Sequence, residues 1–320
     1  MKRIAVLTSG GDAPGMNAAI RAVVRTANYD HIEVYGVQRG YAGLIEGDMA
    51  MLTRRSVSDT IQRGGTILKT ARSAEFETYE GRRQAAGALA ERGIEGLVVI
   101  GGDGSLRGAN DLCREFGIKT VGLPGTIDND LGYTDRTIGF DTAVNTALSA
   151  INNLRDTMSS HDRVVIVQVM GRKSGAIALY AGLAGGAEVI LVPEKPVDYD
   201  EVAAVLNRGK AVGKSSGIVV LAEGSRPLDE AMKELKERTG LSFRSTVLGY
   251  IQRGGSPSMA DRVLASRLGV RAVELLKANQ GGRVVGVKGG EVIDLPIAEA
   301  LAIPPYFDEN LYEQAKILSL

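Results

Sequence analysis

Short apolar runs alternate with helix-period segments along most of the chain. Runs rich in Val, Ile and Leu predict buried strands at 4–9, 32–37, 97–102, 120–125, 164–170, 188–193 and 217–224. Between them, apolar residues recur at positions i, i+3 and i+4, as in MNAAIRAVVRTA (16–27) and DTAVNTALSAINNLRDTM (141–158). Strands that alternate with helices are typical of parallel sheets with crossover helices. The pattern therefore predicts an α/β fold, in two lobes.

Glycine gathers where these predicted strands end. The chain has 41 glycines, and clusters of them stand in SGGD, GGDGS, PGT, MGRKSG and AEGS. In open α/β sheets, ligands bind beyond the carboxyl ends of the strands, so these clusters predict one extended binding site. The hexapeptides IQRGGT (61–66) and IQRGGS (251–256) are near copies. Two copies this short indicate a repeated turn structure and not a duplicated domain.

Composition narrows the class of protein. Hydrophobic residues make up 44% and charged residues 24% of 320 residues, and Lys+Arg and Asp+Glu both number 38. A formal charge of zero argues against a nucleic-acid partner or an anionic membrane. With Cys113 as its one cysteine and only two histidines, the chain suggests neither a disulfide nor a zinc site. The start, MKRIAVLTSGGD, predicts a strand and not a signal peptide. We expect a cytoplasmic enzyme.

Two stretches combine a strand, a Gly-rich turn and a helix, namely TSGGDAPGMN (8–17) and VVIGGDGS (98–105). Glycine lets backbone N–H groups approach phosphate oxygens, and a helix N-terminus adds partial positive charge. Neither stretch is a standard nucleotide motif. Arg107 stands where G-x-G-x-x-G needs its third glycine, and Arg208 stands where the near-match RGKAVGKS needs its first. Each turn alone could be purely structural, whereas the pair favours phosphate binding.

Asp103 lies inside the second Gly-rich turn. A carboxylate there would repel a phosphate unless it served a cation. Mg²⁺ prefers oxygen ligands and commonly uses one or two carboxylates together with waters. Asp103 is therefore a candidate Mg²⁺ ligand, and the alternative is a helix N-cap.

The stretch LPGTIDND (123–130) runs from a predicted strand into a Pro-Gly turn and two aspartates. Asp128 and Asp130 are two residues apart, so in an extended segment their side chains would point the same way. Phosphoryl transfer needs a group that orients or deprotonates the nucleophile. One aspartate could accept a hydroxyl proton while the other supports a metal. The alternative is a pair of Asx-turns that only shapes the loop.

Arginines stand in or beside the other turns and strand ends. Guanidinium groups suit bidentate recognition of phosphate. A single arginine is more often a solvated surface residue, but five in such settings suggest more than one bound phosphate. These five are Arg72, Arg163, Arg172, Arg244 and Arg253.

The motifs together resemble those of bacterial 6-phosphofructokinase, in order and over essentially the whole chain. The matching stretches are LTSGGDAPGMNAAIR, GYAGL, RGGTIL-TAR, VVIGGDGS, PGTIDND, TIGFDTA, VMGRKSG, AEG and VLGYIQRGGSP…DR. The resemblance implies transfer of the γ-phosphate of ATP, with Mg²⁺, to the C1 hydroxyl of fructose 6-phosphate. It also implies two interleaved Rossmann-like lobes with mainly parallel sheets. Residues 1–139 plus 252–302 would bind ATP, and residues 140–251 plus 303–320 would bind fructose 6-phosphate.

By position, the resemblance also implies roles for single residues. The ATP-binding residues would be Gly11, Arg72, Ser73, Gly102, Asp103, Gly104 and Ser105, with Asp103 on Mg²⁺. Asp128 would be the catalytic base, Thr126 would assist it at the sugar, and Arg172 would stabilise the transferring phosphoryl group. The sugar and its phosphate would be bound by Thr126, Ile127, Asp128, Arg163, Met170, Gly171, Arg172, Glu223, Arg244, Tyr250 and Arg253.

The resemblance further implies a homotetramer with shared active sites, in which Arg163 and Arg244 reach the sugar phosphate of a neighbouring subunit. A separate nucleotide effector site would lie at a subunit contact. Its residues would be Arg21, Arg25, Asp59, Arg155, Gly186, Glu188 and Lys214.

The chain departs from the family pattern at two places. Tyr250 stands where the family usually has histidine, and a tyrosine carries no charge at neutral pH. Val212 and Ser216 stand where relatives usually place a basic residue and a histidine. The second departure predicts a weak response to phosphorylated effectors, unless Arg208 or Lys210 compensates.

Three rival functions remain open. Pyrophosphate-dependent relatives tend to carry Asp after GGD and Lys before TIDND, where this chain has Gly104 and Gly125, so ATP is favoured. A NAD or lipid kinase with a GGDG turn would leave PGTIDND and MGR unexplained. A non-catalytic nucleotide sensor would not need Asp103, Asp128 and Arg172.

Overall fold

The computed structural model describes residues 1–214 and 216–319. The chain forms two compact units. The first comprises residues 1–127, 131–142 and 253–304, and the second comprises residues 128–130, 143–252 and 305–320. Each unit is assembled from separated segments of the chain, as expected for interleaved lobes. The binding of ATP by one lobe and of the sugar by the other stays a prediction.

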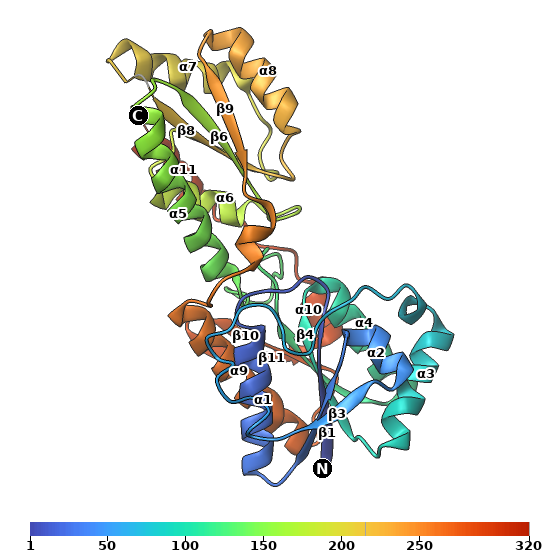
Figure 1. The fold of residues 1–320 in the computed structure, drawn as a ribbon. Coiled ribbons are helices and arrows are strands. Elements are labelled where there is room, and N and C mark those ends of the chain that lie inside the picture. The colour runs from blue at the N-terminus through green and yellow to red at the C-terminus, as the bar shows by residue number, and fades with distance from the viewer. Residues whose placement is uncertain (215, 320) are drawn as a thin grey trace. The chain divides into compact units, whose positions relative to one another are not determined.

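The first unit contains a seven-stranded sheet in the order β11-β10-β5-β4-β1-β2-β3 (Figure 1). Its strands are β1 (Arg3–Ser9), β2 (Glu33–Val37), β3 (Met49–Leu52), β4 (Gly96–Gly101), β5 (Lys119–Pro124), β10 (Arg283–Lys288) and β11 (Glu291–Pro296). The edge strands β3 and β11 pair antiparallel, and the other pairs are parallel. β4 is buried along its whole length, so its unbroken apolar run follows from its central position in a covered sheet.

Helices cover both faces of this sheet. The helical elements of the first unit are α1 (Met16–Tyr29), α2 (Gly40–Glu46), η1 (Glu75–Glu77), α3 (Tyr79–Glu91), α4 (Asp103–Phe116), α9 (Met259–Lys277) and α10 (Ile297–Ala302). α1 packs against α9, and α2, α3, α4 and α10 lie on the opposite face (Figure 1). The core under that second face includes Tyr41, Phe76, Leu97, Leu106 and Ile297. α4 packs on this core through Leu106, and its first turn carries the second Gly-rich turn.

The second unit contains a four-stranded parallel sheet in the order β7-β8-β6-β9. Its strands are β6 (Val164–Val169), β7 (Val189–Leu191), β8 (Gly217–Ala222) and β9 (Phe243–Val247). Its helices are α6 (Ala176–Ala184), α7 (Tyr199–Ala211), α8 (Leu228–Thr239) and α11 (Glu309–Leu318). The helix α5 (Phe140–Ser159) begins in the first unit and continues in the second, and η2 (Gly249–Arg253) ends where the chain re-enters the first unit.

The predicted α/β class and the mainly parallel sheets are confirmed. All seven predicted strands are present, although the run 188–193 forms a strand only over Val189–Leu191. The prediction omitted β3, β9, β10 and β11. In the edge strand β11, Glu291 and Asp294 interrupt the apolar run, whereas β3 is apolar but only four residues long, so neither gave the longer apolar run on which the prediction relied.

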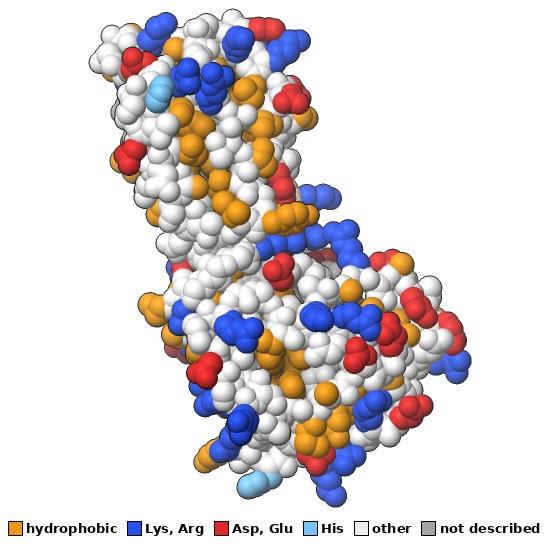
Figure 2. Space-filling model, in the orientation of Figure 1, with side chains coloured by type: hydrophobic (Ala, Val, Ile, Leu, Met, Phe, Trp, Pro, Cys, Tyr) orange, Lys and Arg blue, Asp and Glu red, His pale blue; other side chains and the backbone are white. Residues whose placement is uncertain are grey.

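The surface carries both signs of charge. On the face drawn in Figure 2, both units carry Lys and Arg as well as Asp and Glu side chains, in line with the equal numbers of each in the chain. In residues 1–214 and 216–319, no helix is both long and apolar enough to cross a membrane.

Candidate active site

The carboxyl ends of β1, β4 and β5 lie next to one another in the first sheet. Ser9 is in register with Gly101, and Gly101 is in register with Pro124. The three turns that follow these strands therefore meet at one sheet edge. These are the Gly10–Gly11 turn, the Gly102–Ser105 turn and the start of PGTIDND.

The Gly10–Gly11 turn is held on two sides. Gly10 has a φ of 86°, a left-handed conformation that favours glycine, and its carbonyl accepts a hydrogen bond from Thr70 Oγ1 at 2.8 Å. A methyl group on Gly11 would lie 3.1 Å from Nη1 of Arg253. Arg253, expected at the sugar phosphate, thus lies against the turn expected to bind ATP.

Asn17, which the sequence analysis did not single out, fixes the segment that leads to Arg72 and Ser73. Its buried amide donates to the carbonyls of Arg63 and Gly64 at 3.0 and 3.1 Å and accepts from Ile67 N at 2.7 Å. Asn17 ends the Gly-rich stretch SGGDAPGMN and could have been noted as a candidate on that ground, but only the fold shows that its side chain is buried.

The two near-identical hexapeptides contact each other. Ser256 Oγ donates to the carbonyl of Gln62 at 2.8 Å, and a methyl group on Gly64 would lie 2.2 Å from the carbonyl oxygen of Gly255. The two RGG turns therefore pack backbone against backbone, which only glycine allows.

α4 begins at Asp103, and Gly102 is its N-cap residue. The alternative of Asp103 as a helix N-cap is therefore wrong by one position. The Asp103 carboxylate accepts a hydrogen bond from Nε of Arg107 at 2.8 Å, which raises the pKa of the Arg107 guanidinium. Ser105 is buried beside Gly101, where a methyl group would lie 2.6 Å from the Ser105 side chain.

Gly104 has no packing reason to be glycine. Among the described residues, nothing lies within 4 Å of a methyl group placed on it. Gly125 differs, because a methyl group there would lie 2.8 Å from Ile100 Cγ2 and 3.2 Å from Gly101 N. The open space at Gly104 leaves room for a ligand beside the first turn of α4, and the close packing at Gly125 disfavours a lysine.

A divalent cation would have few protein ligands in this region. In residues 1–214 and 216–319, no group of three or more His, Cys, Asp and Glu side chains is arranged to hold a metal ion. The Asp103 side chain is 41% exposed at the first turn of α4. A single accessible carboxylate fits Mg²⁺ that takes its other ligands from water and phosphate oxygens.

In the second unit, the carboxyl ends of β6 and β8 lie side by side, with Val169 in register with Ala222. Met170–Arg172 follow β6, and Glu223 and Gly224 follow β8. Gly171 has a φ of 133°, and Arg172 has a φ of 53°, a rare conformation for a residue with a side chain.

Two contacts hold Arg172 in that conformation. Glu223 Oε1 accepts a hydrogen bond from Arg172 N at 2.9 Å. A methyl group on Gly224 would lie 1.8 Å from the carbonyl oxygen of Arg172, so the two backbones touch. The AEG stretch thus fixes the backbone of the MGR turn, from which the Arg172 side chain extends.

Nε of Arg172 lies 3.7 Å from Oδ2 of Asp128. Asp128 is 6% exposed, whereas the Arg172 side chain is 59% exposed. The pair thus combines a buried carboxylate with a guanidinium that reaches solvent. Asn129 has a φ of 50°, so the segment is not extended there. The condition under which Asp128 and Asp130 were expected to point the same way, an extended segment, is therefore not met at Asn129.

Gln252 connects the MGR turn to η2. Its buried side chain accepts from Met170 N at 3.3 Å and donates to the carbonyl of Gly249 at 3.0 Å. Tyr250 in the same helix is 78% exposed. Tyr250 therefore lies at the surface of this unit.

Arg163 and Arg244 lie at the other end of the second sheet. Arg163 directly precedes β6, and Arg244 is in register with Val165. Met170 directly follows β6, and a strand rises about 3.3 Å per residue, so roughly 20 Å separates the Cα atoms of Arg163 and Met170. The structure therefore does not bring these two arginines to the MGR turn of the same chain.

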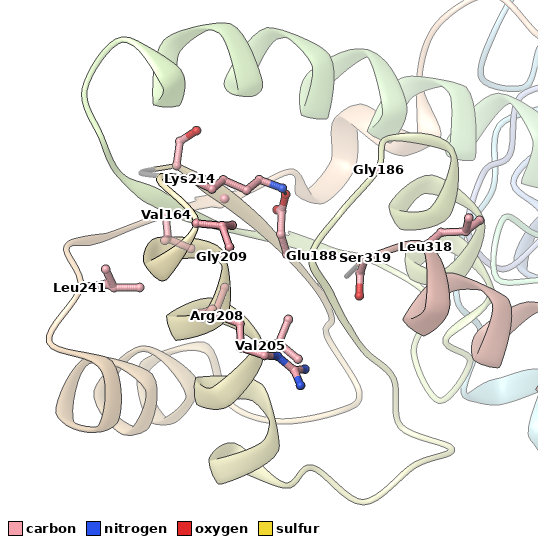
Figure 3. Close-up of a pocket in the computed structure, with 14 residues that line it drawn as sticks. Val164, Gly186, Glu188, Val205, Arg208, Gly209, Lys214, Leu241, Leu318 and Ser319 are labelled. Atoms are coloured by element: carbon pink, nitrogen blue, oxygen red, sulfur yellow. Dashed lines mark ion pairs between the residues drawn. The ribbon is translucent and has the colours of Figure 1, made fainter.

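Three residues expected at an effector site, Gly186, Glu188 and Lys214, line a pocket of about 390 Å³ (Figure 3), and Arg155 contacts two of them. Nη2 of Arg155 donates to the carbonyls of Gly185 and Gly186 at 2.6 and 2.7 Å. The carboxylate of Glu188 pairs with Lys214 and lies 3.8 Å from Nη1 of Arg155. Figure 3 shows the Lys214 and Glu188 side chains directed toward one another.

The same pocket is lined by Arg208 and by Val212, which is 85% exposed. Of the two residues considered as replacements for the missing charges, Arg208 is at the pocket, and Lys210 is not among its lining residues.

The other expected effector residues lie in the first unit. Arg21 and Arg25 are one turn apart on α1, and burial together with the charge of Arg25 lowers the pKa of Arg21. Two guanidinium groups this close favour an anion between them. Asp59 has a φ of 54°, and its carbonyl accepts from Gln62 Nε2 at 3.0 Å.

Known proteins similar to this chain match it over all or nearly all of its length. The family model described as phosphofructokinase matches residues 3–276. Curated proteins named ATP-dependent 6-phosphofructokinase from Clostridium tetani and Clostridium botulinum are each 59% identical over 319 residues, covering 100% of both chains. The solved phosphofructokinase of Saccharomyces cerevisiae superposes with a TM-score of 0.89 at 37% identity, and this chain spans 48% of that longer chain. The chain belongs to the phosphofructokinase family.

Proposed function

We propose that the protein transfers the γ-phosphate of ATP to the C1 hydroxyl of fructose 6-phosphate, giving fructose 1,6-bisphosphate and ADP. The observation that carries the chemistry is the buried Asp128 carboxylate beside Arg172, on a turn that two contacts hold in place. The names of the curated relatives support the choice of substrates.

The first set of turns supports nucleotide binding. Gly11, Gly102 and Ser105 lie at adjacent strand ends, where backbone N–H groups and the N-terminus of α4 suit phosphate oxygens. Arg72 and Ser73 follow the segment that Asn17 holds. The open space at Gly104 suits the rest of the nucleotide, and the close packing at Gly125 supports ATP over pyrophosphate.

Asp103 is the residue that we assign to Mg²⁺. Bound there with the ATP phosphates, the cation would neutralise charge on the transferring group. Asp103 would hold it directly or through water, and Arg107 would keep the carboxylate oriented through their hydrogen bond.

Asp128 is the proposed base. Its carboxylate accepts the proton of the C1 hydroxyl as the oxygen attacks the γ-phosphorus, and the bond to the β-bridging oxygen breaks. Arg172 interacts with the equatorial oxygens of the transferring group, where the charge of the transition state is spread. Thr126 and Ile127 precede the base in the chain and position it against the sugar.

Met170, Gly171, Glu223 and Arg253 are proposed to bind the sugar and its phosphate. Arg163 and Arg244 would bind the same phosphate from a neighbouring subunit. Their place at the opposite end of β6 from the MGR turn supports this, because an arginine side chain cannot span that strand. The proposal therefore requires an oligomer with shared sites, and we infer the homotetramer that the resemblance implies.

The pocket beside Glu188 is proposed to bind effectors weakly. Lys214 and Arg155 already interact with Glu188, and Val212 brings no charge. An effector shifts an equilibrium only by its differential affinity for the two states. One missing charge-assisted hydrogen bond is worth about 1.5–3 kcal/mol, comparable with a typical coupling free energy of about 1–3 kcal/mol.

We expect Asp128→Asn to lose most of kcat while still binding fructose 6-phosphate, because the amide keeps the shape but cannot take the proton. Positioned base catalysis contributes about 10²–10⁴-fold. A coupled assay with ATP or pyrophosphate as the phosphoryl donor measures the loss. The assignment fails if the variant keeps more than half of the wild-type kcat. Faster turnover of the wild type with pyrophosphate than with ATP would overturn the choice of donor.

Gly224→Ala is expected to lower kcat by up to about 10²-fold, since an ångström of misplacement at a catalytic group costs that much. The new methyl group would meet the carbonyl of Arg172 and displace the guanidinium. The control is Gly217→Ala at the other end of β8, where the methyl group would make an ordinary 3.4 Å contact with Glu188. Equal kcat values for the two variants would show that Gly224 does not position Arg172.

A shared site predicts rescue between two defective chains. Arg163→Ala should raise the KM for the sugar by roughly 10- to 150-fold, the value of one lost charge-assisted hydrogen bond.

Co-assembly of Arg163→Ala with Asp128→Asn chains should restore activity above the average of the parents, because some sites combine two intact contributions. Mixtures of Arg172→Ala with Asp128→Asn chains should show no rescue, since both residues act in one chain. Equal behaviour of the two mixtures would refute the shared site.

The effector pocket predicts a weak response that a single charge strengthens. Fructose 6-phosphate saturation of the wild type should stay near-hyperbolic and move little with millimolar ADP or phosphoenolpyruvate. Val212→Lys should enlarge the shift, and Val212→Gln, similar in size but neutral, should not. A large sigmoidal shift in the wild type would show that Arg208 or another group replaces the missing charge.

A further inference from the structure

The connection between β5 and α5, residues 125–139, carries the proposed base but has no helix or long strand to hold it. Its returning end lies alongside its outgoing end. Gly125 and Ile138 form an isolated β-bridge, Ile138 N donates to the carbonyl of Pro124 at 2.8 Å, and Thr137 Oγ1 donates to the carbonyl of Thr126 at 2.7 Å. The position of the Thr126 carbonyl, two residues before Asp128, therefore depends on where residues 137–139 lie.

Residues 137–139 are in turn held by Asp261, which lies on the first turn of α9 and is 1% exposed. Oδ1 of Asp261 accepts from Gly139 N at 2.9 Å, and Oδ2 accepts from Thr142 N at 2.8 Å and from the Thr142 hydroxyl. Both carboxylate oxygens are thus engaged by the start of α5. The N-terminus of a helix favours negative charge, which offsets part of the cost of burying the carboxylate.

The side-chain cap of α9 comes from the Ser258 hydroxyl and not from this carboxylate, although the Thr142 hydroxyl that donates to Asp261 also accepts from Ser258 N at 2.9 Å. Ser258 is the N-cap residue, and its hydroxyl accepts from Asp261 N at 3.2 Å. The Asp261 side chain is therefore directed to the β5–α5 connection and not to its own helix. This separates a role in fixing the connection from a role in forming α9.

Close packing limits how the segment can shift. A methyl group on Gly139 would lie 2.7 Å from Cβ of Ala13, and one on Gly15 would lie 2.7 Å from Cγ2 of Ile138. Residues 138 and 139 are thus enclosed between the turn before α1 and Asp261. Packed interiors transmit displacement instead of absorbing it, so a change at Asp261 reaches Thr126 and the chain beyond it.

We propose that Asp261 is a positioning residue for phosphoryl transfer. It anchors Gly139 and Thr142, these residues fix Thr137, and Thr137 fixes the Thr126 carbonyl and hence the segment that ends in Asp128. The proposal rests on the assignment of Asp128 as the base. Asp261 touches neither substrate in this role, so its loss should lower kcat and leave substrate binding nearly unchanged.

The test compares three single variants of the full-length protein. Asp261→Asn keeps the shape but turns an NH₂ group toward a backbone N–H of Gly139 or Thr142. Thr137→Val keeps the shape and removes the hydroxyl that bonds Thr126. Ser258→Ala removes only the α9 cap.

We expect Asp261→Asn and Thr137→Val to lower kcat at least tenfold with KM values for both substrates within about threefold, as for a catalytic group misplaced by a fraction of an ångström. Ser258→Ala should lower the unfolding temperature but keep kcat within about twofold, since a lost cap costs stability alone.

The Asp261→Asn/Thr137→Val double variant supplies the decisive readout. Two residues in one chain of contacts should act non-additively, so the double variant should lose no more kcat than the more damaged single variant. Multiplied losses would overturn the proposal, as would a kcat for Thr137→Val or for folded Asp261→Asn within twofold of the wild type. If Asp261→Asn does not fold, the comparison of kcat between Thr137→Val and Ser258→Ala still tests the proposal. An active Asp128→Asn would instead contradict the base assignment itself.

Discussion

The Asp128 carboxyl group lies in a place almost closed to water, and the surrounding residues must compensate for that burial. A buried carboxylate is costly unless a partner compensates it. The partner here is Arg172, 3.7 Å away. Arg172 can serve only because its backbone is held in a left-handed conformation by Glu223 and by the close approach of Gly224. The MGR and AEG stretches thus form one structural unit, because β6 and β8, which they follow, end side by side.

Backbone strain at such a site is typical of functional groups. A residue with a side chain in the left-handed region costs of order 1–3 kcal/mol, and the cost is tolerated where neighbouring contacts enforce it. Arg172 and Asn129 are both in this region, and both flank the proposed chemistry.

The sequence predicted the parts of the fold that rest on local pattern. Continuous apolar runs identified β1, β4, β6 and β8, because central parallel strands are buried on both faces. β10 is buried only between its ends, where Arg283 and Lys288 bound a short run, and β9 mixes Arg244 and Ser245 into a half-exposed edge. Pattern alone does not distinguish such strands from loops.

At the site, the motifs indicated which residue types matter but not how they are held. Asn17, Gln252 and Asp261 look like ordinary polar residues in helices or turns, and only tertiary contacts reveal that each is buried and bonded to a distant backbone. The position of Arg244 was likewise beyond the sequence, since it depends on the pairing of the unpredicted β9 with β6, whereas the predicted strand 164–170 already placed Arg163 at the opposite end from Arg172.

The central claim is that Asp128 and Arg172 act as one unit in the phosphoryl-transfer step. A double-mutant cycle with Asp128→Asn and Arg172→Ala, read as the single-turnover rate at saturating ATP and fructose 6-phosphate, tests it most directly. Residues that act as a unit are strongly non-additive in their effects on the rate. The account predicts that the double variant reacts about as slowly as the slower single variant. Losses that multiply would contradict it, because the two residues would then contribute independently.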